Sequence, residues 1–238
     1  MRRHRVFQTS LLSALLDGVY DGDLSVGELL EHGDFGIGTF NALDGEMLVL
    51  DGICYRFRAD GTVSQACVDD LTPFAVITTF EPQITLPIEG RMSRAEVVAA
   101  IEAAVDSQNY LFAVKVSGRF ADVRTRTVVK QSTPYVGLRE AAKNESILSF
   151  TDLDGTVVGF RTPLYERGIG VPGGHVHFIN DAKSLGGHVL DFTIESGTIE
   201  ICEGTDLDLR LPLTDSFMQA RLAPEDIDEQ TRVTENEG

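Results

Sequence analysis

The stretch from residue 171 to 192 carries three of the five histidines and constrains the fold more than any other segment. His175 and His177 are two residues apart, so on a β-strand their side chains leave the same face. Turn-forming residues follow, and a second apolar run then returns along the first. With residues 182–183 at the tip, His188 lies opposite His177 on the shared face of a β-hairpin. The spacing therefore predicts a hairpin on which three imidazoles converge.

Three histidines that meet at one point are typical of a metal site. Neutral imidazole suits zinc, copper, iron or nickel, and three protein ligands leave one coordination position open for a substrate. A single histidine on a strand is more often a core or surface residue, and a His-x-His pair alone is a weak signal. The third histidine strengthens it, as do the glycine pairs at 173–174 and 186–187, which let the backbone approach a small site.

Composition limits the classes of partner. The formal net charge is −17 over 238 residues, which disfavours binding to nucleic acid or to anionic membranes. The three cysteines lack Cys-x-x-Cys spacing, so we expect reduced thiols and no disulfide framework. The apolar run at residues 11–16 is too short for a signal peptide, and Asp17 interrupts it. We therefore expect a cytoplasmic protein.

Short strands punctuated by Asp-Gly pairs predict an antiparallel meander near the N-terminus, with strands at 35–40, 46–50 and 53–57. Helices are expected over residues 9–33 and 93–107, and each region contains a Ser-x-x-Glu capping box.

The C-terminal half adds a hairpin over residues 147–160, then the histidine hairpin. We therefore expect an α+β fold of two mainly antiparallel or mixed β-sheets with a few short helices, and with the metal site on a C-terminal hairpin. The whole chain, 1–238, is expected to form one catalytic unit. Its N-terminal sheet region would cover about 1–130 and its C-terminal sheet region about 131–238.

Two charged residues on strands have ordinary interpretations. Glu46 follows an Asp-Gly turn, where a glutamate is usually an exposed carboxylate at the end of a strand. Arg124 and Arg126 alternate along one strand and are expected on one face, which for arginine is usually solvated. An arginine that points inward would need an anion as its partner.

A three-histidine metal supports several chemistries, because it can activate water, polarise a carbonyl or hold an oxygen-rich ligand. A cupin-like, metal-dependent oxygenase and a non-catalytic metal-binding β-domain therefore stay open as alternatives. A small DNA-associated β-fold class carries a similar histidine hairpin, but the net charge counts against it. Metal analysis combined with an activity assay would separate an enzyme from the non-catalytic alternative.

Three blocks of sequence, at 155–192, 33–47 and 124–131, resemble the α-acetolactate decarboxylase family, and they occur in the family's order. The resemblance extends from about Val6 to the last residues. It implies a lyase that converts 2-acetolactate to acetoin and carbon dioxide at a Zn²⁺ site without an organic cofactor, as in acetoin and butanediol biosynthesis. It also implies a homodimer formed through the N-terminal sheet.

The resemblance assigns roles to individual residues. It matches the zinc ligands to the hairpin histidines, namely His175, His177 and His188. Glu46 matches a glutamate that reaches the metal, Arg126 matches the active-site arginine, and Thr39 matches a threonine of the substrate pocket. A glutamate from the C-terminal tail also belongs to the family's site, and Glu235 is the best match, with Glu237 as its alternative.

These residue types fit the expected reaction. Acetolactate can chelate one metal through its hydroxyl and ketone oxygens, and loss of carbon dioxide leaves negative charge on an enediolate. Arg126 would orient the carboxylate or the oxyanion. Glu46 or Glu235 would then protonate one face of the carbon to give a chiral product.

Overall fold

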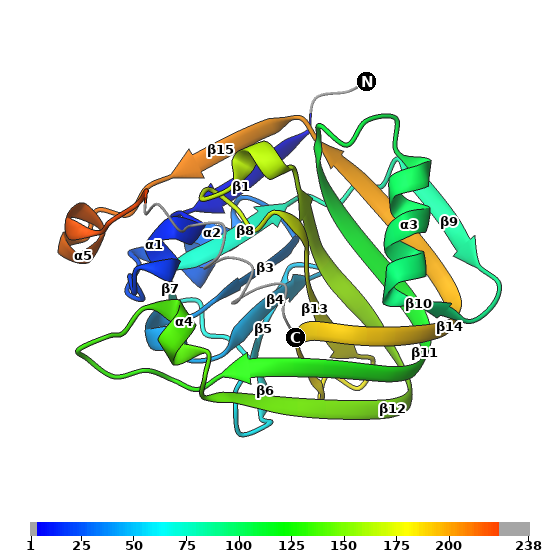
Figure 1. Ribbon diagram of the computed structural model, residues 1–238, viewed down its shortest axis with the longest axis horizontal. Coiled ribbons are helices and arrows are strands. Elements are labelled where there is room, and N and C mark those ends of the chain that lie inside the picture. The colour runs from blue at the N-terminus through cyan, green and yellow to red at the C-terminus, as the bar shows by residue number, and fades with distance from the viewer. Residues whose placement is uncertain (1–3, 224–238) are drawn as a thin grey trace.

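The computed structural model describes residues 4–223, whose two large β-sheets face each other across a shared core (Figure 1). Most of the first sheet is blue and cyan in Figure 1, whereas the long strands of the second sheet are green and yellow. Few helices are present, and all of them are short. The predicted α+β class, with antiparallel and mixed sheets, is therefore confirmed.

The first sheet has the strand order β15-β1-β8-β3-β4-β5-β6, and only the β1–β15 pair is parallel among its described strands. Its strands are β1 (Arg5–Thr9), β3 (Phe35–Thr39), β4 (Glu46–Leu50), β5 (Ile53–Phe57), β6 (Val63–Gln65), β8 (Phe74–Thr78) and β15 (Asp206–Arg210). Strands β3 to β6 follow one another in chain order, so the predicted meander is confirmed. Asp51 and Gly52 both have positive φ, as a two-residue hairpin turn requires.

The second sheet is antiparallel and partly closes on itself. Its strands are β9 (Ile84–Ile88), β10 (Met92–Ser93), β11 (Leu111–Val128), β12 (Glu145–Thr162), β13 (Gly173–Asn180) and β14 (Gly186–Gly204). Strand β11 pairs with β12 and β14, while β13 also pairs with both β12 and β14. Strands β11 to β14 therefore form a closed ring of four neighbours at the end of the sheet that carries the histidines.

The expected division of the sheets near residue 130 is wrong. Strands β9, β10 and β11 all precede that residue yet belong to the second sheet, while β15 returns to the first. The reason is the length of β11, because its ladders with β12 and β14 extend along almost the whole strand. These pairings join segments that are far apart in the sequence, which local patterns do not reveal.

The helical expectation for residues 9–33 is only partly met. Two short helices occupy this region, α1 (Leu12–Leu16) and α2 (Val26–Leu30), with β2 (Leu24–Ser25) before α2 pairing with β7 (Leu71–Thr72). Gly18 has φ +89°, which a continuing helix cannot accommodate. The capping box at Ser25 forms as predicted, and so does the one at Ser93 that begins α3 (Arg94–Ala104). The remaining short helices are η1 (Asn41–Leu43), α4 (Leu138–Ala141), η2 (Leu164–Glu166) and α5 (Asp215–Gln219).

Apolar side chains fill three regions. The largest lies between the sheets and combines residues of the first sheet, such as Phe35 and Leu48, with residues of the second, such as Val158 and Phe160. A second cluster lies between α3 and the second sheet, and a third covers the other face of the first sheet. Most of this burial joins elements that are distant in sequence, so the two sheets stabilise each other.

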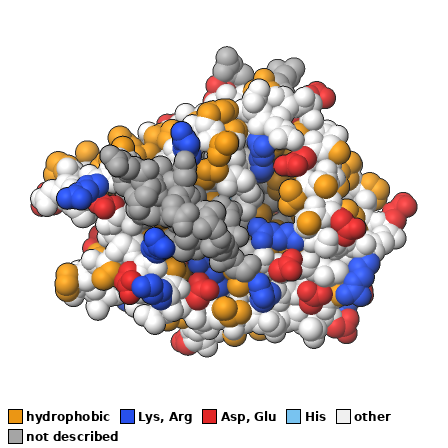
Figure 2. Space-filling model, viewed as in Figure 1, with side chains coloured by type: hydrophobic (Ala, Val, Ile, Leu, Met, Phe, Trp, Pro, Cys, Tyr) orange, Lys and Arg blue, Asp and Glu red, His pale blue; other side chains and the backbone are white. Residues whose placement is uncertain are grey.

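The surface is charged and mixed. Figure 2 shows acidic and basic side chains interspersed over the visible face. No helix in residues 4–223 is long and apolar enough to cross a membrane.

A glycine on β12 allows the close approach of the histidine strand. A Cβ at Gly159 would lie 2.1 Å from the carbonyl oxygen of His175 and 2.6 Å from the Cα of Val176. Gly159→Ala should therefore lower the free energy of unfolding by about 2–3 kcal/mol, as overpacking does, in a denaturant titration. Gly174→Ala is the matched control on the facing strand, because its Cβ would have no described heavy atom within 4 Å. Equal stability of the two variants would contradict this account.

Candidate metal centre

The histidine hairpin forms with the predicted register. His177 on β13 pairs directly with His188 on β14, and His175 lies two residues before His177 on the same strand. One ring nitrogen of each histidine lies within 4.8 Å of the others, and the ring centroids are 5.0 to 5.4 Å apart. The predicted convergence of three imidazoles is therefore confirmed, and this group could hold a metal ion.

The surroundings of His177 favour a metal ligand. Its side chain is fully buried, and Nδ1 lies 2.7 Å from the backbone oxygen of Met47 on β4. A neutral imidazole that donates from Nδ1 has its lone pair on Nε2. That Nε2 atom is buried and has no hydrogen-bond partner among the described residues. A buried nitrogen that lacks a partner fits metal coordination, and the carbonyl contact fixes the ring orientation.

Burial keeps all three histidines neutral. It lowers the pKa of His177 to about 4 and the pKa values of His175 and His188 well below their usual range. The positive charge of nearby Arg126 lowers all three pKa values further. Neutral imidazole is the form that binds metal, so the site is ready for a cation near neutral pH without losing protons.

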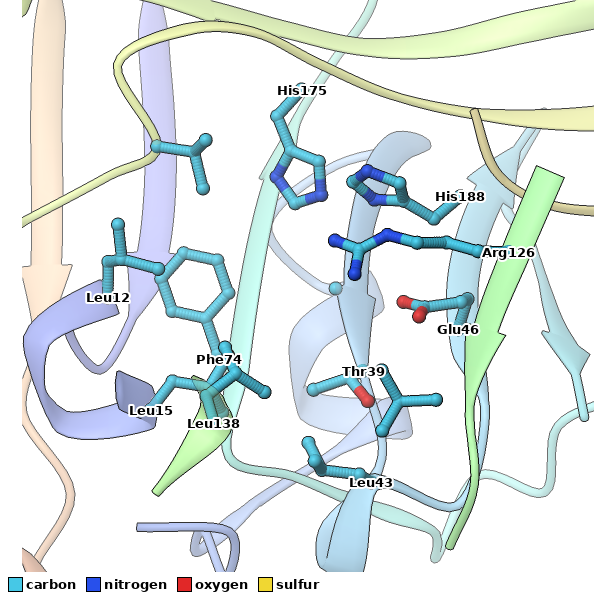
Figure 3. A pocket seen from close by; sticks show the side chains of 13 residues that line it. Leu12, Leu15, Thr39, Leu43, Glu46, Phe74, Arg126, Leu138, His175 and His188 are labelled. Atoms are coloured by element: carbon cyan, nitrogen blue, oxygen red, sulfur yellow. The ribbon is translucent and has the colours of Figure 1, made fainter. Parts of the chain in front are cut away.

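A pocket opens beside the histidines and brings several expected residues together (Figure 3). His175, His188, Arg126, Glu46 and Thr39 all line it. In Figure 3 the guanidinium of Arg126 lies beside His188, with the carboxylate of Glu46 below it. The site is therefore assembled from both sheets, because Thr39 and Glu46 belong to the first and the other three to the second.

Glu46 is not the exposed strand-end carboxylate that its position in the sequence favours. Its side chain is only 15% exposed, and Oε2 lies 3.7 Å from Nε2 of His177. The reason is tertiary, because the start of β4 packs against the histidine strand β13. Thr39 pairs with Glu46 across the β3–β4 ladder, and its hydroxyl donates to the backbone oxygen of Gly45. This bond holds the turn from which Glu46 projects.

Arg126 lies inward although Arg124, two residues earlier, is exposed. Both still share one face of β11, because its ladder with β12 is continuous from Asp122 to Val128, but only Arg124 has the solvated position usual for a strand arginine. The ladder with β14 differs between the two positions. Thr125 pairs with Val189, but Arg124 pairs with Asp191, so one residue of β14 has no partner on β11. Such a β-bulge bends the strand and increases its twist. Beyond the bulge, Arg126 pairs directly with His188.

Two side-chain contacts near the site could not be predicted from the sequence. Arg94 at the start of α3 donates to the backbone oxygen of Leu190, the bulged residue. Glu145 accepts a hydrogen bond from Nη1 of Arg126 at 3.0 Å. Both contacts depend on the register of long strands, and no local motif marks either residue.

Apolar side chains line the rest of the pocket. They come from α1, η1, α4 and neighbouring strands and loops, and comprise Leu12, Leu15, Leu43, Phe74, Val128, Leu138 and Val171. Several of them face the polar residues in Figure 3. The arrangement offers a small ligand charged groups on one side and an apolar wall on the other. The tail glutamates expected at the site, Glu235 and Glu237, lie outside the described residues.

Comparison with known proteins identifies relatives along nearly the whole chain. The profile of the Alpha-acetolactate decarboxylase family matches residues 6–224. The alpha-acetolactate decarboxylase of Bacillus subtilis strain 168 is 42% identical over 231 residues, which are 97% of this chain and 91% of that protein. The corresponding protein of Methylococcus capsulatus is 42% identical over 220 residues, which are 92% and 85% of the two chains.

Solved structures agree with this result. The crystal structure of the Bacillus subtilis strain 168 protein has a TM-score of 0.95 at 42% identity and covers 97% of this chain and 99% of its own. A Staphylococcus aureus protein described as similar to alpha-acetolactate decarboxylase has a TM-score of 0.94 at 33% identity, with coverages of 97% and 100%.

Replacing a hairpin histidine should release the metal. Removing one of three ligands weakens coordination, so His175→Ala, His177→Ala and His188→Ala should each contain much less than one ion per chain by elemental analysis. His32→Ala is the control, because that ring stacks on Phe7 at 3.6 Å, away from the hairpin. Full metal content in a variant that lacks all three hairpin histidines would rule out this site.

Proposed function

Because the chain belongs to the alpha-acetolactate decarboxylase family, we propose that its three hairpin histidines hold a zinc ion in the site that decarboxylates 2-acetolactate. The activity is that of the family, a carboxy-lyase that forms acetoin. The observation that carries the proposal is the convergence of His175, His177 and His188 beside a pocket in a chain related over nearly its full length.

Zinc suits this set of ligands. Three neutral imidazoles with one side open to a pocket are typical of catalytic zinc. When bound, zinc supplies a Lewis acid that polarises oxygens of the substrate and stabilises negative charge on them. The carbonyl of Met47 supports the proposal, because it fixes which nitrogen of His177 faces the ion.

Arg126 is proposed to hold the reacting carboxylate or the oxygen on which charge develops. Its side chain is only 10% exposed, so its charge acts in a medium that screens little. The planar guanidinium can donate two parallel hydrogen bonds to a carboxylate, which fixes orientation as well as binding. On the departing carboxylate this fork only orients the group, because that carboxylate loses its charge as carbon dioxide leaves. A hydrogen bond to the oxygen on which charge develops strengthens instead, so it favours the transition state over the bound substrate.

Protonation must follow the loss of carbon dioxide. Glu46 lines the pocket and is proposed to deliver a proton to one face of the enediolate carbon. Glu235 is the second proposed donor, and Glu237 is its alternative. Since a single face is protonated, the position of the donor decides which enantiomer of acetoin forms.

The apolar wall and Thr39 complete the proposed binding site. The leucines and Phe74 line one side of the pocket, and we propose that they exclude water there and contact the methyl groups of acetolactate. Thr39 is proposed to shape the substrate pocket. Its hydroxyl already donates a hydrogen bond to the backbone oxygen of Gly45, so we assign it no direct role in the reaction.

We also propose a homodimer that forms through the first sheet. Strand β15 ends this sheet, and the apolar residues Leu207, Leu211 and Leu213 on and after it are exposed. An exposed strand edge with apolar neighbours is suited to pairing with another chain. Light scattering at micromolar concentration should give the mass of two chains, and the mass of one chain would contradict the proposal.

Arg126→Ala should reduce turnover while the metal stays bound, because the guanidinium contacts the substrate and not the ion. Losing a charged hydrogen bond to the transition state corresponds to about 2–4 kcal/mol, or on the order of a hundredfold in kcat. Arg126→Lys should restore little of this rate, since an ammonium cannot form the planar fork. The test is kcat for acetoin formation together with metal content. Normal turnover by the alanine variant would refute the role given to Arg126.

Glu46→Gln should slow product formation or reduce the enantiomeric purity of acetoin, because an amide cannot deliver the proton. Chiral chromatography of the product, alongside a rate assay, measures both effects. Glu235→Gln and Glu237→Gln are the comparison variants that separate the proposed donors. If Glu46→Gln makes acetoin of normal chirality at the normal rate, Glu46 is not the donor.

A further inference from the structure

We propose that Glu145 is a positioning residue that holds the guanidinium of Arg126 in the orientation needed for decarboxylation. The inference rests on the function proposed above. Glu145 is not one of the described residues that line the pocket. It would therefore act through Arg126 and not on the substrate itself.

The strand register brings the two side chains together. Arg126 on β11 pairs with Ile147 on β12, and Val128 pairs with Glu145. Glu145 is therefore the diagonal neighbour of Arg126, a distance that a long arginine side chain can span. Nη1 of Arg126 lies 3.0 Å from Oε2 of Glu145, and the two side chains are 10% and 23% exposed.

The backbone of Glu145 is itself well fixed. The amide of Val129 donates to the backbone oxygen of Asn144 at 3.1 Å, which closes the connection immediately before Glu145. The residue then begins β12, whose pairing with β11 is continuous at this end. The strand backbone from which its carboxylate projects is thus held by the scaffold, as the partner of an oriented side chain requires.

Orientation is the main effect expected of this pair. A guanidinium carries five N–H donors in one plane, so a bond to one of its nitrogens restricts the direction of the others. On its other side β11 pairs with β14, which places His188 next to Arg126 (Figure 3). The desolvation of two charges offsets much of their attraction when an ion pair is buried, so we expect the pair to add little net stability.

The test is a double-mutant cycle between Glu145 and Arg126, measured as kcat, KM, metal content and melting temperature. Glu145→Ala should lower kcat on the order of ten- to a hundredfold, as misplaced catalytic groups do, with metal content and melting temperature nearly unchanged. Glu145→Gln retains an acceptor and should lose less. In the Arg126→Ala background, Glu145→Ala should have no further effect, because the group that it positions is absent.

A second ion pair of the same sheet provides the control. Nζ of Lys115 on β11 lies 2.7 Å from Oε2 of Glu200 on β14, with side-chain exposures of 23% and 24%. Glu200→Gln removes a comparable carboxylate away from the pocket and should leave kcat and KM unchanged.

The outcomes separate this inference from the proposed function. If the effects of Glu145→Ala and Arg126→Ala multiply in the double variant, or if Glu145→Ala behaves like Glu200→Gln, the positioning role is wrong and the role of Arg126 stands. If Arg126→Ala alone leaves kcat normal, the proposed role of Arg126 fails and this inference fails with it. Should Glu145→Ala not fold, the cycle is completed with Glu145→Gln.

Discussion

Cross-strand pairing around the ring of the second sheet is the constraint on which the site depends. At one level of the ring, Arg126 pairs with His188, and His188 pairs with His177 on its other side. Side chains at paired positions leave the same face of a sheet, so three functional groups enter one space without help from loops. A slip of one residue in any ladder would turn a ligand to the opposite face. The bulge in β14 fixes this register, which explains why a break in regular pairing lies beside the site.

Electrostatics of the site follow from where these strands lie. Buried histidines stay neutral and so can accept a cation, while the nearby arginine makes their protonation still less favourable. The carboxyl group of Glu46 stands at the edge of the same space. A divalent ion would therefore enter a site that contains the guanidinium of Arg126, the nearby carboxyl groups of Glu46 and Glu145, and three neutral imidazole ligands. Such a balance suits a reaction in which the substrate arrives as an anion.

Local patterns in the sequence predict the parts of this protein that depend on near neighbours. The histidine hairpin, the Asp-Gly meander and both capping boxes need only residues within a few positions of one another, and all of them form. The sheet boundary near 130 is wrong, and the helical expectation for 9–33 is only partly met. Arg126 also departs from the solvated position usual for a strand arginine. Tertiary pairing decides all three. The burial of Glu46 arises in the same way, through the packing of β4 against β13. The pairing of Arg126 with Glu145 likewise depends on a ladder that closes over a long connection.

The hydrogen bond from His177 to the backbone of Met47 joins a ligand of the second sheet to a strand of the first. Anything that holds this imidazole in place therefore also holds the two sheets together. By thermodynamic linkage, an ion that binds only the assembled pair of sheets opposes their separation, and looser packing between them weakens the hold on the ion by the same free energy. The packing of the core between the sheets is thus part of the affinity of the site for the ion.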